Sequence, residues 1–467
     1  MTTVLRSASA ILAIAFAVTA GPTAHGAVDQ VFVTNSNDSG AGSFREAILQ
    51  ANADPQIARV LFEGRVTSIR LITPVQFVGG QDLAIDGNSA TLDGSALASA
   101  SAAFIATGGG DLAISSLTVR DTPGEGIAVE VPAGATGTLS VSLFKVDIID
   151  NAGHGVLIND QEDPSTTDGA QPDARGSAAS IEVTVVNSRF IHNGYSVSDR
   201  DGLRVNEGGD GDLSITVKHT IAHDNGADGI EVDERGAGDV HVDIAHTQFT
   251  ENGRLDPSDL DDGFDIDEYN DGSIVGRVFQ SESNRNFEEG FDFNENNAGD
   301  LRVDLQHVEA SGNGEEGIDY EEDDDFAGGG DLVAEMTHVI ANGNGVNNDG
   351  DAGLKIREKG VGNLDVNVVD VETSNNLIGG ISVREDDNGD LAASISRATS
   401  LANGGRGIDF DENGIGNLAA TVSGSTILTN ADVDLRADEA STGVGVLHVL
   451  NVTYATSGGN VPPTGAK

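Results

Sequence analysis

The sequence predicts an all-β protein built as a parallel β-helix, a solenoid whose coils each contribute three short strands. Two observations lead to this prediction: an acidic phrase returns at a fixed period, and apolar and polar residues alternate around it. GIDFDENGIGNL at 407–418 recurs as GFDFNENNAGDL at 290–301 and as GIEVDERGAGDV at 229–240. Most spacings between the anchor residues that open the phrase are 27 residues, a period typical of stacked repeats. The anchors are Gly202, Gly229, Gly263, Gly290, Gly317, Gly353, Gly380, Gly407 and Asp434.

Each coil is expected to contain three strands. The first strand follows the anchor and has apolar residues at its first and third positions, as in Ile230 and Val232. The second begins at an Asp-Leu or Asn-Leu pair and alternates again, as in Leu301, Val303 and Leu305. The third is short and carries smaller residues. Alternation with a period of two predicts strands that bury one face.

A column of asparagines supports stacked coils. An Asn lies four residues before most anchors, or further where the chain carries an insertion. Stacked amides can bond to one another along a coil and satisfy the backbone of a tight turn. We therefore expect an asparagine ladder. Its members are Asn193, Asn225, Asn252, Asn286, Asn313, Asn344, Asn376, Asn403 and Asn430.

The two ends of the chain differ from the repeats. Residues 1–26 have the pattern of a secretory signal peptide, with Arg6, a short apolar run and small residues before a cleavage site. Residues 27–80 are expected to form a cap of a strand, a turn and an amphipathic helix, in which Ser43 and Glu46 make a capping box. The β-helix is expected over 81–456 and a flexible tail over 457–467.

Residues 42–47 of the cap read GSFREA and resemble the CSLREA-type motif of exported bacterial right-handed parallel β-helix proteins, with Gly42 in place of Cys and Phe44 in place of Leu. The resemblance covers about twenty residues. It implies export and a right-handed coil, and it implies little about activity, because such coils serve many functions.

The composition narrows the possible partners. The 467 residues carry a formal charge of −51, which argues against nucleic acid as a partner. The apolar run near the start is too short for a comfortable membrane span. The chain has no cysteine, so disulfides cannot stabilise it. We expect an exported protein, secreted or on the cell surface, with divalent cations and polysaccharide or surface matrix as candidate partners.

A column of glutamates occupies the fifth position after every anchor. Charges stacked about 4.8 Å apart repel one another. Two interpretations remain open: each Glu accepts hydrogen bonds from turn N–H groups, or the column shares a row of cations. The column consists of Glu207, Glu234, Glu268, Glu295, Glu322, Glu358, Glu385, Glu412 and Glu439.

Acidic residues also occupy seven of the eight second and fourth positions after the anchors in four consecutive coils, from Glu231 to Glu321, where the alternation predicts that side chains point outward. Carboxylates at this spacing suit hard cations, so Ca²⁺ between coils is the favoured interpretation. A solvated acidic face of a salt-adapted protein is the alternative. Insertions on both sides of this strand suggest a groove. The candidate metal ligands are Glu231, Asp233, Asp265, Asp267, Asp292, Asp319, Glu321, Asp409 and Asp411.

Three basic residues interrupt the acidic face and suggest that the protein could be an enzyme. Lys355 could act as the base of a polysaccharide lyase, with Arg357 and Arg384 neutralising a uronate. A glycoside hydrolase fits less well, and the three cations could simply balance neighbouring acids.

Four histidines share another outward column, where a transition metal or plain surface exposure is possible: His219, His246, His307 and His338.

The sequence thus favours a secreted or surface-associated acidic scaffold that binds divalent cations, Ca²⁺ above others, in attachment or matrix. A carbohydrate-active enzyme with its site near Lys355 and a non-catalytic adhesin or spacer are the alternatives. No organic cofactor is expected.

Overall fold

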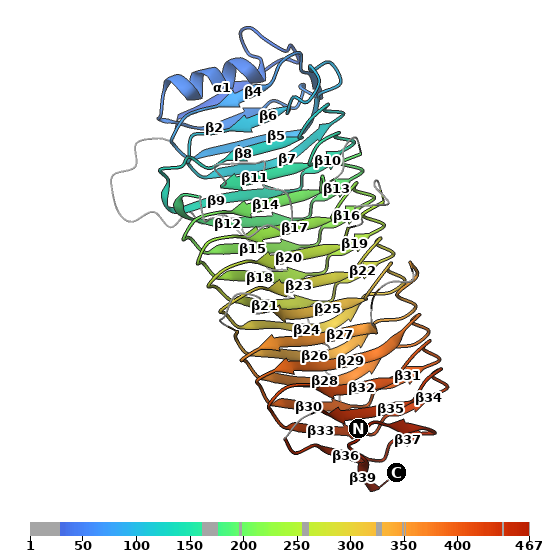
Figure 1. Cartoon of the computed structure of the whole chain (residues 1–467). Helices are drawn as coiled ribbons and strands as arrows, with labels where there is room; N and C mark the ends of the chain where they lie inside the picture. The colour runs from blue at the N-terminus through green and yellow to red at the C-terminus, as the bar shows by residue number, and fades with distance from the viewer. Residues whose placement is uncertain are drawn as a thin grey trace, which may run out of the picture.

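The protein is a right-handed parallel β-helix, seen in the computed structural model as one long stack of coils (Figure 1). The structure describes residues 29–160, 176–195, 199–254, 261–323, 329–347, 350, 352–440 and 443–466. The predicted signal peptide lies outside these ranges, as do most of the insertions expected to border a groove. No helix in the described part of the chain is long and apolar enough to cross a membrane.

The first strands of the coils form one continuous parallel sheet of 14 strands. Its strands are β4 (Val75–Phe77), β6 (Phe104–Ala106), β8 (Ile127–Glu130), β11 (Val156–Asp160), β14 (Leu203–Glu207), β17 (Ile230–Glu234), β20 (Phe264–Glu268), β23 (Phe291–Glu295), β25 (Ile318–Asp323), β27 (Ala352–Gly360), β29 (Gly379–Asp387), β32 (Ile408–Glu412), β35 (Leu435–Glu439) and β38 (Ser457–Gly458). Anchors align across this sheet, so that Ile230 pairs with Phe264 and Asp265 with Asp292.

The second and third strands form the other parallel sheet, which bends at a corner between them. The second strands are β5 (Leu83–Asp93), β7 (Leu112–Arg120), β9 (Thr136–Phe144), β12 (Ala178–Val186), β15 (Leu213–Lys218), β18 (Val240–Ala245), β21 (Ile274–Phe279), β24 (Leu301–Glu309), β26 (Leu332–Ile340), β28 (Leu364–Glu372), β30 (Leu391–Ser396), β33 (Leu418–Ser423), β36 (Val446–Leu450) and β39 (Pro463–Ala466). The third strands are β10 (Asp147–Ile149), β13 (Arg189–Ile191), β16 (Ile221–His223), β19 (Gln248–Thr250), β22 (Glu282–Asn284), β31 (Thr399–Leu401), β34 (Thr426–Leu428) and β37 (Thr453–Tyr454). In β24, β26 and β28 one strand continues around the corner.

A short cap closes the first coil. It consists of β1 (Asp29–Val33), α1 (Phe44–Ala53), β2 (Ile57–Phe62) and β3 (Ser68–Arg70). The Ser43 side chain accepts a hydrogen bond from the Glu46 N–H at 3.1 Å and so begins α1. The ring of Phe44 packs 5.2 Å from that of Phe62 between centroids. At the other end, part of the expected tail is strand, because β39 pairs with β36.

The asparagine ladder is present and extends one coil further than expected. The Nδ2 of each Asn donates to the Oδ1 of the next, from Asn151 to Asn193 at 2.8 Å and onward to Asn430. All but the last are buried. Beneath the ladder the core contains stacked aromatics, including Phe293 and Tyr320 with centroids 5.0 Å apart. The ladder and the apolar core together hold the coils in register.

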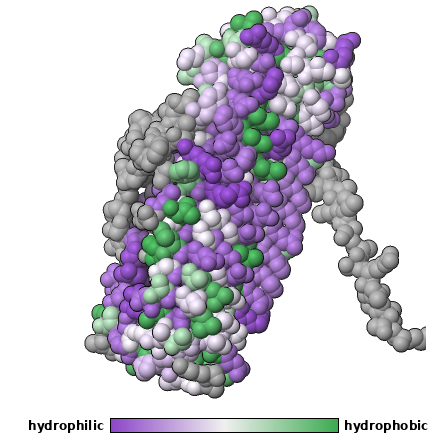
Figure 2. All heavy atoms as spheres, turned by 90° about the vertical axis from the view of Figure 1, so that its right-hand side faces the viewer, coloured by the Kyte–Doolittle hydropathy of each residue, from purple (hydrophilic) through white to green (hydrophobic). Residues whose placement is uncertain are grey.

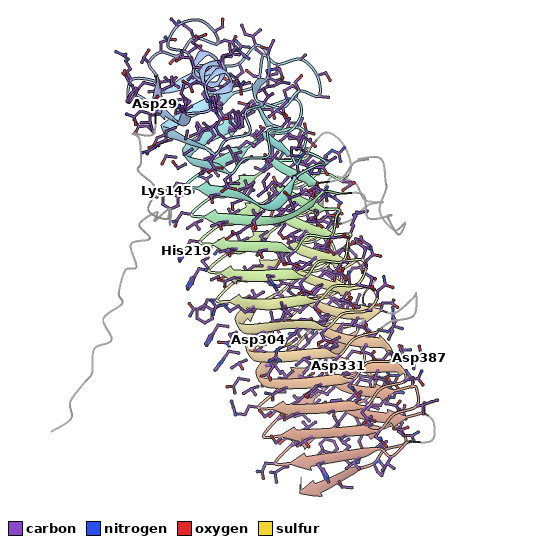
Figure 3. The ribbon with its side chains drawn as sticks, turned by 90° about the vertical axis from the view of Figure 1, so that its left-hand side faces the viewer. Asp29, Lys145, His219, Asp304, Asp331 and Asp387 are labelled. Atoms are coloured by element: carbon purple, nitrogen blue, oxygen red, sulfur yellow. The ribbon has the colours of Figure 1, made fainter. Side chains whose placement is uncertain are left out.

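Much of the outer surface is polar. The face shown in Figure 2 is largely hydrophilic, with hydrophobic residues in scattered groups. Figure 3 shows polar side chains along the opposite side, with Lys145 and His219 at one edge of the stack. This distribution agrees with the formal charge of −51.

Candidate metal centre

Two columns of acidic side chains lie together on the first-strand sheet, over β17 to β25. One column contains the second-position residues that the sequence analysis selected. The other contains the residue immediately before each anchor, which the sequence analysis did not select. We call the six acids at the centre of these columns the carboxylate array. It comprises Asp228, Glu231, Asp262, Asp265, Glu289 and Asp292.

The column before the anchors is fixed by the backbone. Asp201 Oδ1 accepts a hydrogen bond from the N–H of Asp228 at 3.1 Å. Asp228 Oδ1 accepts from the N–H of Asp262, and Asp262 Oδ1 from the N–H of Glu289, each at 2.6 Å. Each of these carboxylates therefore uses one oxygen to hold the next coil. The second oxygen of Asp201 lies 3.1 Å from His154 Nδ1 and 3.6 Å from the Arg204 guanidinium, whereas those of Asp228 and Asp262 form no ion pair among the described residues.

Asp265 lies at the centre of the array. One oxygen of Asp265 lies within 4.8 Å of oxygens of Asp262 and Asp292, and one lies within 4.8 Å of oxygens of Asp228 and Glu231. The Oδ1 atoms of Asp265 and Asp292 are buried and have no hydrogen-bond partner among the described residues. A buried carboxylate oxygen without a donor is costly, so these two atoms point to a missing positive ligand.

Burial and mutual repulsion perturb the whole array. The pKa of Asp265 lies well above its usual value, first because burial disfavours the charged form and then because Asp267 and Asp292 repel it. Burial followed by the charge of Asp319 raises the pKa of Asp292 in the same way. Burial also leads the rise in the pKa of Asp262, where Glu289 adds repulsion. A bound cation would reverse these effects.

A basic residue closes each end of the array. Arg204 donates to Glu231 Oε2 at 2.5 Å and to Asp233 Oδ2 at 2.9 Å. At the other end, Lys355 Nζ lies 2.6 Å from Asp319 Oδ2 and 2.9 Å from Glu321 Oε2. Between these two residues, no basic side chain in the described part of the chain forms an ion pair with Asp262, Asp265 or Asp292.

The outer face is less exposed than the sequence analysis expected. Its side chains point away from the apolar core, but Arg204, Glu231, Asp233, Asp319 and Asp409 are all buried. These side chains are buried because the coils stack closely. Side chains of the second- and fourth-position columns pack against one another in neighbouring coils, and the acids before the anchors cover the edge of the second-position column.

Most fourth-position candidates and those of the last coils pair with basic residues of the protein, whereas Asp267 accepts a hydrogen bond from a tyrosine. Asp233 pairs with Arg204 and Arg235, and Asp267 accepts from the Tyr269 hydroxyl at 2.6 Å. Glu321 lies among Lys355 and Lys359. Asp409 and Asp411 both pair with Arg436, at 2.9 and 3.0 Å. Of the nine predicted metal ligands, the structure therefore brings Glu231, Asp265 and Asp292 into the array.

The proposed lyase cations are likewise engaged. Arg357 and Arg384 share Asp386, at 2.9 and 2.8 Å. Burial alone would lower the pKa of Lys355, but Asp319 and Glu321 raise it above its usual value. An amine held protonated between carboxylates is a poor general base. All three residues therefore lie in ion pairs with neighbouring acids.

The histidine column occupies the corner between the second and third strands. His219, His246, His307 and His338 adopt positive φ of 52–57° there, the left-handed conformation that turns the chain. Their rings stack in pairs, with centroids 4.7 Å and 4.5 Å apart. None of the close groups of three metal-ligating atoms among the described residues includes a histidine.

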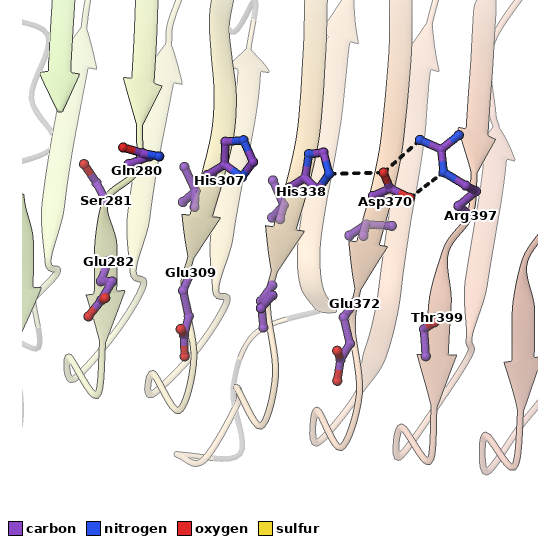
Figure 4. A pocket seen from close by; sticks show the side chains of 14 residues that line it. Gln280, Ser281, Glu282, His307, Glu309, His338, Asp370, Glu372, Arg397 and Thr399 are labelled. Atoms are coloured by element: carbon purple, nitrogen blue, oxygen red, sulfur yellow. Dashed lines mark hydrogen bonds and ion pairs between the residues drawn. The ribbon is translucent and has the colours of Figure 1, made fainter. Parts of the chain in front are cut away.

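An open groove of about 550 Å³ lies beside this column (Figure 4). The Asp370 carboxylate links His338 Nε2, at 3.3 Å, to Arg397, at 2.5 and 2.8 Å. The lining crosses five coils and includes Gln280, Glu282, His307, Glu309, Glu372 and Thr399. The groove therefore presents hydrogen-bond donors and acceptors at every coil.

No family model and no curated protein sequence matches the chain. Solved structures resemble it at low identity. The periplasmic alginate epimerase AlgG shares 12% identity over 85% of this chain and 76% of its own, with a TM-score of 0.38. The A-module of a mannuronan C-5 epimerase from Azotobacter vinelandii shares 11% over 93% and 100%, with a TM-score of 0.39. The Streptococcus pneumoniae surface adhesin PfbA shares 10% over 92% and 91%, with a TM-score of 0.36. At these identities and TM-scores the likenesses support no conclusion about activity.

Proposed function

We propose that the protein is an exported acidic β-helix scaffold that binds divalent cations, Ca²⁺ above others, in the carboxylate array. The observation that carries the proposal is the central group of Asp262, Asp265 and Asp292. Their oxygens lie within 4.8 Å of one another, and two Oδ1 atoms in the group are buried without a donor.

Calcium fits this site better than a transition metal or Mg²⁺. All the available ligand atoms are carboxylate oxygens, which hard cations prefer. Ca²⁺ accepts irregular geometry with 6–8 oxygens, whereas Mg²⁺ requires near-ideal octahedral geometry. An ion between two coils would contact side chains from both. It would therefore bind the folded coil and not the unfolded chain.

Thermal unfolding tests this proposal. The protein is first treated with a chelator and then titrated with Ca²⁺ or with NaCl at matched ionic strength. We expect a stabilisation that saturates at micromolar to millimolar Ca²⁺ and that NaCl does not reproduce. Equal stabilisation by the two salts would mean that the acids are a screened, solvated face, and it would refute the site.

The groove beside His307 favours a second role in binding polysaccharide, consistent with attachment to a surface or matrix. Its polar groups recur at each coil, as an extended polyhydroxylated chain would require. Binding of neutral and uronate polysaccharides should weaken in His307→Ala and remain unchanged in Asp265→Asn. Binding that is equal in both variants and in the wild type would place the glycan elsewhere.

A further inference from the structure

The fifth-position glutamates form a second ladder inside the coil, which we call the glutamate ladder. It begins with an aspartate in the preceding coil, Asp160, and continues from Glu207 to Glu439. From Glu207 to Glu412 every member is fully buried, with 0% exposure. The ladder therefore places a carboxyl group in the interior of every coil along most of the stack.

In six members of the ladder, one oxygen of the carboxyl group caps the turn that follows it. Glu207 Oε2 accepts from the N–H of Gly209 at 3.0 Å, and Glu234 Oε1 accepts from the N–H of Gly236 at 2.9 Å. Similar bonds are made by Glu268, Glu322, Glu358 and Glu412. These bonds confirm the turn-capping interpretation for one oxygen of each of these six side chains, whereas neither oxygen of Glu295, Glu385 or Glu439 has a hydrogen-bond partner among the described residues.

The second oxygens of three stacked members have no donor. Those of Glu207, Glu234 and Glu268 are buried and receive no N–H or O–H hydrogen from the described residues. The register of the sheet places Glu207 beside Glu234 and Glu234 beside Glu268 in neighbouring coils. Two ionised carboxylates cannot hydrogen-bond to each other, because neither has a hydrogen to donate. A hydrogen bond between such neighbours requires a proton on one of the two carboxyl groups.

Four members of the ladder have no basic partner: among the described residues, no ion pair reaches Glu207, Glu268, Glu295 or Glu385. The charged groups that act most strongly on Glu207, Glu295 and Glu385 are acids, namely other members of the ladder, Asp160 beside Glu207 and Asp300 beside Glu295. The close groups of three ligand atoms found elsewhere on this sheet do not include a ladder residue.

We propose that the glutamate ladder is hemiprotonated in the folded protein, so that protons shared between successive carboxyl groups hydrogen-bond neighbouring coils together at neutral pH. The ladder is then a row of proton-binding sites that forms only when the coils stack. It also lowers the negative charge of the folded chain below its formal value.

The direction of the pKa shifts agrees with this arrangement. Burial, followed by the neighbouring Glu234, raises the pKa of Glu207 to about 10. Burial, followed by the charge of Glu358, raises the pKa of Glu385 to about 9. Both values exceed those of the unfolded chain. The ladder therefore stabilises the fold fully at low pH, and this stabilisation is lost as the pH rises through about 9 to 10.

The first experiment is infrared spectroscopy of the folded wild-type protein at pH 7, in the carbonyl region of protonated carboxylic acids. We expect a band that persists with Ca²⁺ present and that loses intensity in Glu207→Gln and in Glu385→Gln. A glutamine amide supplies the N–H donor that the proposal assigns to the shared proton, so both variants should fold. Glu182→Gln, at an exposed position of β12, is the control and should leave the band unchanged.

Proton release gives an independent measurement. Unfolding at pH 7 should release about one proton fewer from Glu385→Gln than from the wild type, and between pH 8 and 11 the variant should lose less stability. If the wild type has no protonated-acid band, or if variants and wild type release equal numbers of protons, the proposal is overturned. Specific stabilisation by a cation that is lost in Glu385→Gln, without a change in proton release, would also overturn it and assign a metal to the ladder.

Discussion

Replacing Asp265 with Asn should change the stability of the protein in opposite directions with and without Ca²⁺. Asp265 lies within 4.8 Å of two neighbouring acids in each of two groups. At an effective dielectric constant of about 20, two ionised groups at that distance repel by about 3 kcal/mol. The raised pKa of Asp265 means that partial protonation relieves some of this repulsion. We therefore expect the variant to be about 1–3 kcal/mol more stable than the wild type in chelator.

Calcium should reverse the order. At a Ca²⁺ concentration about 100 times the Kd, binding stabilises the wild type by about 2.7 kcal/mol. The variant lacks one carboxylate at the centre of the array and should gain little. Urea unfolding of both proteins in chelator and in Ca²⁺ measures the four free energies. Asp365→Asn, at an exposed position of β28, is the matched control and should respond to Ca²⁺ as the wild type does.

The result that would refute this reasoning is a constant difference between the wild type and Asp265→Asn in the two conditions. It would mean that Asp265 does not bind the ion. A variant less stable than the wild type in chelator would show that Asp265 already has a favourable partner in the metal-free protein. Either result would contradict the account of its buried Oδ1 atom.

The regular part of the structure could be predicted from the sequence because it follows from the period of the repeat. The 27-residue spacing aligns equivalent residues in neighbouring coils, so the asparagine ladder and the buried fifth-position glutamates follow from alternation alone. The Asp265–Asp292 pairing follows in the same way. The helix α1 followed from its capping residue Ser43 and its apolar face.

The remaining features depend on packing between columns, which alternation does not describe. Alternation placed Asp233 on the outer face but could not show that Arg204 and Arg235 bury it. The acids before the anchors were missed, although five consecutive coils carry one there: Asp201, Asp228, Asp262, Glu289 and Glu316. That run was the available signal. The histidine column was expected to point outward, but its sequence did not show that it forms a left-handed corner.

Three further predictions concern the stability of the coil and its cap. Asn313→Ala should lower the free energy of unfolding, measured in urea, by about 3 kcal/mol, because buried partners in the coils above and below lose their hydrogen bonds. An unchanged midpoint of urea unfolding would show that the asparagine ladder does not stabilise the protein. Lys355→Met should cost about 3–5 kcal/mol at neutral pH. Burial alone would raise the pKa of Glu321, but Lys355 and Lys359 hold it at about 2. The wild type should therefore keep this stabilisation above pH 5 and lose it as the pH falls towards 2. A Lys355→Met variant whose stability falls with pH as that of the wild type does would contradict the pairing. Ser43→Ala should lower the free energy of unfolding by about 1 kcal/mol, because it removes the hydrogen bond from the Glu46 N–H. Amide hydrogen exchange should then become faster in α1 alone. Faster exchange throughout the β-helix would contradict a local role of this cap.

The most direct test of the central claim is the anomalous scattering of crystals grown with Ca²⁺. The account predicts a peak between the coils of β20 and β23, within ligand distance of Asp262, Asp265 and Asp292. The carboxylate oxygens should lie 2.3–2.6 Å from the ion. Crystals in millimolar Ca²⁺ that show no peak at the array, with Asp265 Oδ1 contacting only water or protein, would contradict it.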